Sequence, residues 1–426
     1  MKVLLKSVKI IEPGTALNGQ TKDLVIHDGV IAAISESGTS PTEGYEIIAG
    51  NQLNVSPGWF DLHVNLGEPG YEQREDLISG TLAAATGGFT GVLCMPSTEP
   101  ALDSKSGIAF IQSRTNGNIV DVIPAGAITV NRDGKDLAEL YDMWISGAPA
   151  FTDDQRPLQN AGMMQKALQY CKDFGAKVMV FPEDKDLAGK GQMNEGETST
   201  SLGIKGSPSI AETLIIQRDL KLLEYTGGSV HFSTISTAAS VDLIRAAKSK
   251  GLKVTADVSV HHLYFNDQVL EGFDTNFKVK PPIRTEVDRI ALIEGLKDGT
   301  IDAITTDHRP FDIESKKKEF DLASFGIAGL ETGFGAINQA VKNLLPMESI
   351  INCLAIHPRK ILGLPIPTIK IGEKANLTIF DATSEWLAET QHLKSKGCNN
   401  PFIGKKLKGK SIAIINNNKI FKSSEN

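Results

Sequence analysis

Residues 57–70 read PGWFDLHVNLGEPG, an apolar strand pattern that ends in a Gly-Glu-Pro-Gly turn. Side chains two positions apart on a strand point to the same side, so positions 63 and 65 share one face. Two imidazoles at these positions could bind one zinc ion. Position 63 holds a histidine, His63, but position 65 holds an asparagine, Asn65. A neutral amide oxygen is a poor ligand for zinc. The stretch therefore has the frame of a metal-binding strand whose metal site is weakened or absent.

The same strand pattern recurs along the chain, each time followed by a helical pattern. The apolar runs lie at residues 60–66, 91–95, 120–125, 148–152, 177–181, 229–234, 253–260 and 301–306. Helical patterns between the runs include 76–85, 163–174, 210–224, 240–249 and 287–296. Eight strands with intervening helices predict an α/β fold, a closed (β/α)8 barrel of the TIM type, which we place at residues 57–366.

Both ends of the chain have a different pattern, of short strands broken by turns. Residues 1–56 need no helix, and the strand pattern returns between residues 376 and 422. Neither end supplies enough strands to bury a core alone. We therefore expect residues 1–56 and 367–426 to form one small β-sandwich domain.

Composition narrows the function classes. The chain has 426 residues and a net charge of −7, without a clustered basic tract, so we expect no nucleic-acid partner. No apolar run approaches the ~20 residues that span a bilayer, and no export signal is recognisable, which predicts a cytoplasmic protein without a membrane partner. The four cysteines lack paired spacing, which excludes a disulfide framework and a cysteine-built zinc site. Small molecules or proteins are the expected partners.

A series of short motifs runs in one order along nearly the whole chain. Besides Pro57-Gly58 and Asp61-Leu62-His63, it includes Glu68-Pro69-Gly70, Glu75-Asp76, Gly87-Gly88-Phe89-Thr90, Met95-Pro96, Phe151-Thr152-Asp153-Asp154, Glu183-Asp184, Ala211-Glu212, Arg218-Asp219, Pro281-Pro282-Ile283-Arg284, Thr306-Asp307-His308 and the stretch 325–332. The series resembles dihydroorotases of the type found in multifunctional complexes, within the cyclic amidohydrolase superfamily.

The resemblance implies an amidohydrolase-type barrel with a metal centre at the carboxyl ends of its strands, beside a β-sandwich built from both termini. In the family, metal ions activate a water that opens a cyclic amide, and the aspartate of the eighth strand moves the proton. In this chain that aspartate is Asp307. Asp307 is therefore the catalytic residue if the protein is active.

The resemblance also implies six metal-ligand positions. Three keep a ligand, and these are His63, Asp154 and Asp307. Three have lost a histidine, and these are Asn65, Phe181 and Thr234. The change at Phe181 matters most, because an apolar ring cannot coordinate and displaces water. We expect zinc, if any, to bind weakly or as a single ion. Alternatively, Asp154 and Asp307 bond to backbone amides or neighbouring basic side chains.

The substrate positions implied by the resemblance are changed as well. The arginine that pairs with the substrate carboxylate in the family is replaced by Gly67. Two asparagines are replaced by Ser97 and Lys280, and the second histidine of Asp-His-x-Pro-His is replaced by Phe311. Loss of the guanidinium removes a bidentate contact that is typically the strongest polar term in carboxylate recognition. The metal site and the substrate pocket are thus altered together.

Three functions remain open. The first is an inactive dihydroorotase-like protein of pyrimidine biosynthesis that acts as a structural or regulatory partner of aspartate transcarbamoylase, since the family includes inactive members that assemble with this enzyme. The second is an active dihydroorotase, which interconverts dihydroorotate and N-carbamoyl-aspartate, with an atypical metal site that holds one or more ions. The third is a related hydantoinase or allantoinase. In each case we expect a homo-oligomer.

Overall fold

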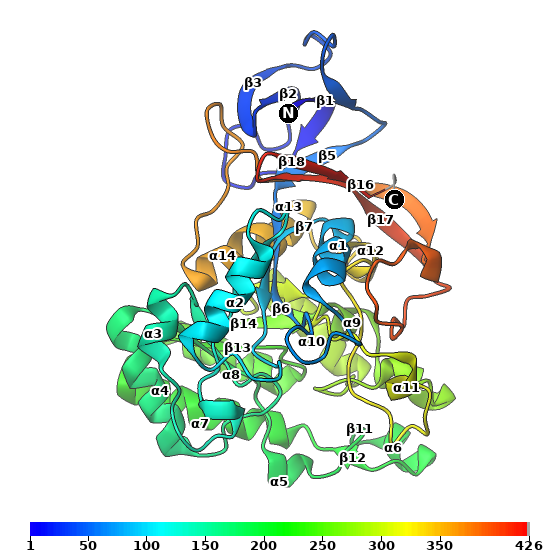
Figure 1. Ribbon diagram of the computed structural model, residues 1–426. Helices are drawn as coiled ribbons and strands as arrows, with labels where there is room; N and C mark the ends of the chain where they lie inside the picture. The colour runs from blue at the N-terminus through cyan, green and yellow to red at the C-terminus, as the bar shows by residue number, and fades with distance from the viewer. Residues whose placement is uncertain (424–426) are drawn as a thin grey trace.

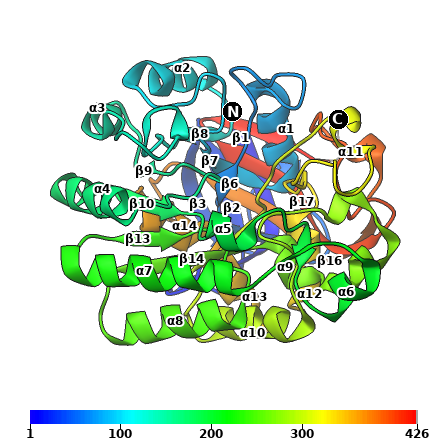
Figure 2. The same ribbon diagram turned by 90° about the horizontal axis from the view of Figure 1, so that it is seen from below.

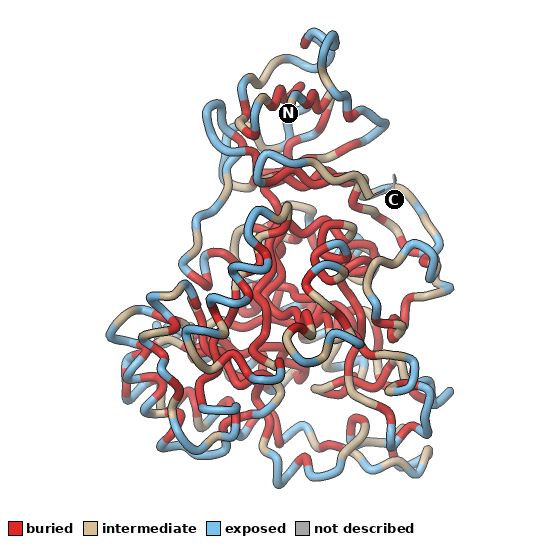
Figure 3. Tube along the Cα trace, in the orientation of Figure 1, coloured by how far each residue is buried: buried red, intermediate tan, exposed pale blue. Residues whose placement is uncertain are grey.

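The structure, a computed structural model, describes residues 1–423 and has two parts (Figure 1). A sheet formed by both ends of the chain lies at one end of a larger α/β body. Figure 3 shows that buried segments run through the interior of both parts, with exposed segments around them. None of the helices within residues 1–423 is long and apolar enough to cross a membrane.

The sheet at the chain ends has the strand order β18-β17-β16-β5-β1-β2-β3, and β4 pairs with β1. Its strands are β1 (Lys2–Ile10), β2 (Thr21–His27), β3 (Val30–Glu36), β4 (Glu46–Ile48), β5 (Asn54–Pro57), β16 (Leu377–Leu387), β17 (Lys406–Asn416) and β18 (Lys419–Lys422). The two ends join where β5 pairs antiparallel with β16. Hydrogen bonds thus connect the expected terminal strands from both ends of the chain. The β-sandwich arrangement of these strands stays a prediction.

The first strand illustrates how sequence sets this sheet. Val3 and Leu5 lie in the core of the sheet, and so do Val8 and Ile10, although alternation would turn even-numbered residues outward. The register shifts between Leu5 and Val8, and Ser7 has a φ of 56°. A bulge of this kind adds one residue to the strand and returns the apolar side chains to the same face.

The larger body contains eight parallel strands. They are β6 (Trp59–Val64), β7 (Phe89–Cys94), β8 (Asp121–Pro124), β9 (Ala150–Phe151), β10 (Lys177–Val180), β13 (Val230–Phe232), β14 (Val254–Ser259) and β15 (Ala303–Thr305). Isolated parallel bridges join Gly126 to Phe151 and Val64 to His308. The ladders and the two bridges connect the eight strands in a ring. Each of the eight predicted apolar runs overlaps one of these strands.

Helices surround this ring of strands (Figure 2). The longer ones are α1 (Leu77–Gly87), α2 (Lys105–Thr115), α4 (Ala161–Phe174), α7 (Ile210–Thr226), α8 (Ala238–Ser249), α10 (Glu286–Lys297) and α12 (Gly333–Ala340). Shorter elements are α3 (Leu140–Ile145), α5 (Lys185–Ala188), β11 (Met193–Asn194), α6 (Glu197–Leu202), β12 (Gly206–Ser207), α9 (Val260–Tyr264), α11 (Ile313–Lys316), α13 (Met347–Ile351) and α14 (His357–Leu362). All five predicted helical segments fall on α1, α4, α7, α8 and α10.

Candidate functional site

Three side chains that the sequence assigned to a metal site meet at the carboxyl ends of the barrel strands. His63 belongs to β6, Asp154 follows β9 and Asp307 follows β15. The His63 Nε2 atom lies 2.8 Å from Asp154 Oδ1 and 3.7 Å from Asp307 Oδ1. All three side chains are buried. The structure therefore brings the three retained ligand positions together.

An arginine that the sequence analysis did not single out completes this cluster. The Arg309 Nη2 atom donates hydrogen bonds to both carboxylate oxygens of Asp154, at 2.7 and 2.8 Å. The Ser97 hydroxyl also donates to Asp154, and Arg132 Nη1 donates to the Ser97 oxygen at 2.6 Å. Both Asp154 oxygens are thus engaged by protein groups. This is the alternative in which the carboxylate bonds to a neighbouring base.

The electrostatics of the cluster follow from burial and close charges. Burial lowers the pKa of His63, but its hydrogen bond to Asp154 and the nearby carboxylates outweigh burial and raise this pKa to about 9. Burial raises the pKa of Asp154, but the charge of Arg309 and the His63 hydrogen bond outweigh it and hold this pKa well below the usual range. Burial raises the pKa of Asp307 to about 7, against the charges of His63 and Arg309. The Asp154 carboxylate is therefore an anion between two cations.

The three positions at which the sequence predicted a lost histidine also lie at strand ends. Asn65 follows β6, Phe181 follows β10 and Thr234 lies two residues beyond β13. All three are buried, and the Asn65 Nδ2 atom and the Thr234 hydroxyl have no hydrogen-bond partner. Within residues 1–423, no group of three or more His, Cys, Asp or Glu side chains is arranged to hold a metal ion. The donor set does not fit a zinc centre, because its carboxylate is bonded to Arg309 and none of the three other predicted ligand positions holds a histidine.

The backbone at these strand ends is unusual. The φ angles of Asp154, Thr234 and Asp307 are 54°, 53° and 48°. Such left-handed values are rare outside glycine, and for a β-branched residue such as threonine they are strained. The barrel mouth therefore has the same backbone conformation at a lost ligand position as at two retained ones.

Backbone atoms crowd Gly67, the position at which the sequence predicted a lost substrate-binding arginine. Gly67 has a φ of +69°, and a Cβ atom there would lie 2.3 Å from the Glu75 carbonyl oxygen and 2.8 Å from that of Tyr71. Real Cβ atoms essentially never approach other atoms so closely. A side chain of any size would require the turn over residues 67–75 to move. Gly67 thus cannot be replaced by arginine without rearrangement.

The other predicted substrate positions have protein partners. Ser97 bonds to Asp154, as described above. Lys280 Nζ forms an ion pair with Glu183 Oε1 at 2.8 Å. The Arg74 guanidinium lies 4.9 Å from the centre of the buried Phe311 ring, a cation–π contact. Of the four substrate positions, Ser97 is therefore the one that the hydrogen bonds join directly to the His63 cluster.

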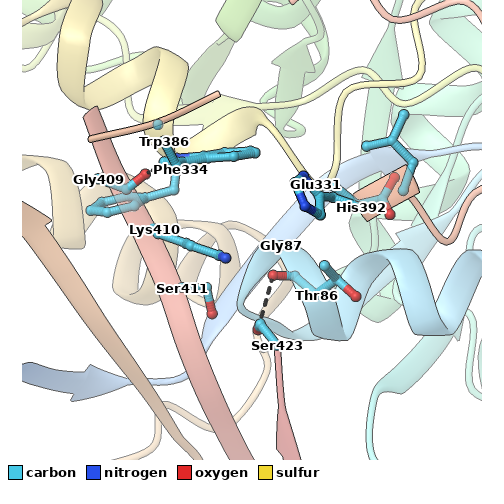
Figure 4. A pocket seen from close by; sticks show the side chains of 12 residues that line it. Thr86, Gly87, Glu331, Phe334, Trp386, His392, Gly409, Lys410, Ser411 and Ser423 are labelled. Atoms are coloured by element: carbon cyan, nitrogen blue, oxygen red, sulfur yellow. Dashed lines mark hydrogen bonds between the residues drawn. The ribbon is translucent and has the colours of Figure 1, made fainter. Parts of the chain in front are cut away.

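A cavity of about 170 Å³ lies elsewhere, between α1, α12, β16 and β17 (Figure 4). Its lining includes Glu331, Trp386, Lys410 and Ser411. Burial raises the pKa of Glu331 to about 7. None of the residues assigned to the metal or substrate positions lines this cavity, so it is separate from the candidate site.

Comparisons with known proteins place the chain among related sequences. A family model described as "Dihydro-orotase-like" matches residues 53–240. The chain is 44% identical to a dihydroorotase of Pelotomaculum thermopropionicum over 97% of both chains, and 40% identical to one of Geotalea daltonii over 99% of both. Among solved structures, it resembles the L-hydantoinase (dihydropyrimidinase) of Arthrobacter aurescens, with a TM-score of 0.86 and 22% identity over 98% of this chain and 95% of that one. At this identity the structural likeness establishes the fold.

Proposed function

The chain belongs to the dihydroorotase family of the cyclic amidohydrolase superfamily, and from this premise we propose that it is a catalytically inactive member. In this proposal it acts in pyrimidine biosynthesis as a structural or regulatory partner of aspartate transcarbamoylase. The observation that carries the proposal is the bonding of Asp154. Its two oxygens are held by Arg309, His63 and Ser97, while imidazoles are missing at three further positions. Hydrolysis by a metal-activated water requires ligands that can reach the metal.

The closed turn at Gly67 gives independent support. An active enzyme of this type needs a cation for the substrate carboxylate, and a side chain at the family's arginine position would clash with backbone oxygens here unless the turn moved. Loss of the metal and loss of the anchor affect different steps, activation of water and binding of substrate. A chain that lacks both has lost catalysis at two places.

Activity and metal content test the inactivity directly. Purified protein is assayed for hydrolysis of dihydroorotate and for cyclisation of N-carbamoyl-aspartate, with and without added zinc or cobalt. We expect turnover at background and well under one zinc ion per chain. Loss of a metal removes several kcal/mol of transition-state stabilisation, or about three orders of magnitude in rate. Turnover that the Asp307→Ala substitution abolishes, or two tightly held ions per chain, would overturn the proposal.

The partnership with aspartate transcarbamoylase has its own test. The resemblance to inactive family members motivates it, and a rigid barrel that has lost catalysis can still present a surface to a partner. The two proteins from one organism are mixed and separated by size-exclusion chromatography with light scattering, which also gives the oligomeric state of each. We expect co-elution and a change in transcarbamoylase activity. Separate elution without any effect on activity contradicts the partnership.

A second candidate is an active dihydroorotase with an atypical site at His63, Asp154 and Asp307. The proximity of these three residues favours it, and the relatives at 40–44% identity are named dihydroorotases. Metal-dependent turnover in the assay above would decide for this candidate. Hydantoin and allantoin belong in the same assay, although the hydantoinase structures support only the fold.

A further inference from the structure

The ion pair between Arg309 and Asp154 lies at the point where the family would need a metal ligand. The Asp154 side chain is fully buried and the Arg309 side chain is 13% exposed. One guanidinium nitrogen contacts both carboxylate oxygens, at 2.7 and 2.8 Å. Asp154 is therefore bonded to a cation that belongs to the chain itself.

The charges around Asp154 explain why a cation is needed there. Asp154 and Asp307 both lie within 4 Å of His63 in a buried cluster. Burying a carboxylate without a nearby positive charge is strongly unfavourable. In an active metalloenzyme the metal supplies this charge, whereas here the cations next to Asp154 are Arg309, His63 and, through Ser97, Arg132. A guanidinium keeps its charge at every accessible pH.

We propose that Arg309 replaces the metal ion of this site, neutralising Asp154 and excluding divalent cations from the barrel mouth. The inference rests on the proposed absence of a metal centre and adds the residue that maintains this absence. A divalent ion that bound Asp154 would have to separate this ion pair and leave the guanidinium buried without its partner. Both changes oppose binding.

The test removes Arg309 and measures the response to metal. Arg309→Ala is compared with wild type and with Arg245→Ala, which breaks an exposed ion pair to Asp242 and Asp298. The thermal midpoint and cobalt binding by equilibrium dialysis are measured without metal and with zinc or cobalt. We expect wild type and Arg245→Ala not to respond. We expect Arg309→Ala to lose stability without metal, to regain it with metal, and to bind cobalt at least tenfold more tightly than wild type.

Equal cobalt affinity of Arg309→Ala and wild type would overturn the inference. Should Arg309→Ala fail to fold without metal, the double variant Asp154→Asn with Arg309→Ala, which leaves no unpaired carboxylate, is expected to fold and not to respond to metal. If this double variant fails to fold, the Arg309 side chain is needed for packing and not to neutralise Asp154, which would also overturn the inference. Metal-dependent turnover of the wild type would instead refute the proposed function. An inactive, metal-free wild type whose Arg309→Ala variant gains no metal would refute the inference alone.

Discussion

Replacing Gly67 by alanine tests whether the backbone has closed the position of the carboxylate-binding arginine. The left-handed φ of +69° costs a residue with a Cβ atom about 1–2 kcal/mol. The new Cβ would overlap the Glu75 and Tyr71 carbonyl oxygens, and overpacking of this kind costs typically about 1–3 kcal/mol. Alanine also lowers the conformational entropy of the unfolded chain, which stabilises the folded state by roughly 0.7 kcal/mol. We therefore expect Gly67→Ala to lower the free energy of unfolding by about 3 kcal/mol.

A second glycine, matched in backbone conformation, separates the backbone cost from the cost of steric overlap. Gly175 has a φ of +76° and nothing within 4 Å of the position of its absent Cβ, so Gly175→Ala carries the backbone cost alone, about 1 kcal/mol after the same correction. Both variants are unfolded in urea and their free energies of unfolding compared. If the two differ by less than about 0.5 kcal/mol, the turn yields easily and the argument that the anchor position is closed fails.

Three further predictions concern the strand ends and one buried acid. Histidines restored together at Asn65, Phe181 and Thr234 should bind less zinc than the same variant with Arg309→Ala added, by elemental analysis after dialysis; equal zinc contents would count against a competing guanidinium. Thr234 has a φ of 53°, so the Thr234→Gly variant should have a free energy of unfolding in urea about 1 kcal/mol higher than that of Thr234→Ala. At a position with negative φ, the alanine variant would be the more stable of the two. Burial raises the pKa of Asp219 from 3.8 to about 6, so its protonated form stabilises the fold below about pH 4 and this contribution is lost as pH rises through 6. The free energy of unfolding of wild type relative to Asp219→Asn should therefore fall between pH 4 and 6, and a constant difference would contradict this.

The barrel strands could be predicted because their sequence signal is local. Each buried strand is a short apolar run bounded by polar turns, and such runs stand out without knowledge of their partners. The pairing at the chain ends could not be read in the same way. Alternation identified strands in residues 1–56 and 376–422, but hydrogen-bond partners depend on register, which placed β5 and β16 in one sheet.

The candidate site was predictable only in part. His63 lies near the end of one strand of a parallel barrel and Asp154 and Asp307 follow two others. The carboxyl ends of such strands meet at the same face. Arg309 was missed, although it stands two residues after Asp307 in the strand-eight motif. A long side chain can point in several directions, and its contact with Asp154 depends on packing across the mouth. Adjacency to the motif was the only signal.

The barrel mouth keeps its shape through contacts that need no metal. Backbone strain persists where surrounding structure fixes it. At the strained Thr234 the backbone N–H donates to Asp257 at 2.6 Å, and His231 Nε2 lies 2.8 Å from the other oxygen of that carboxylate. Across the first and last strands, Asp61 accepts hydrogen bonds from the Thr306 N–H and hydroxyl at 2.9 and 2.6 Å. Because these buried bonds fix the strand ends, the frame does not depend on a bound metal, and a rigid frame is what the proposed assembly role would require.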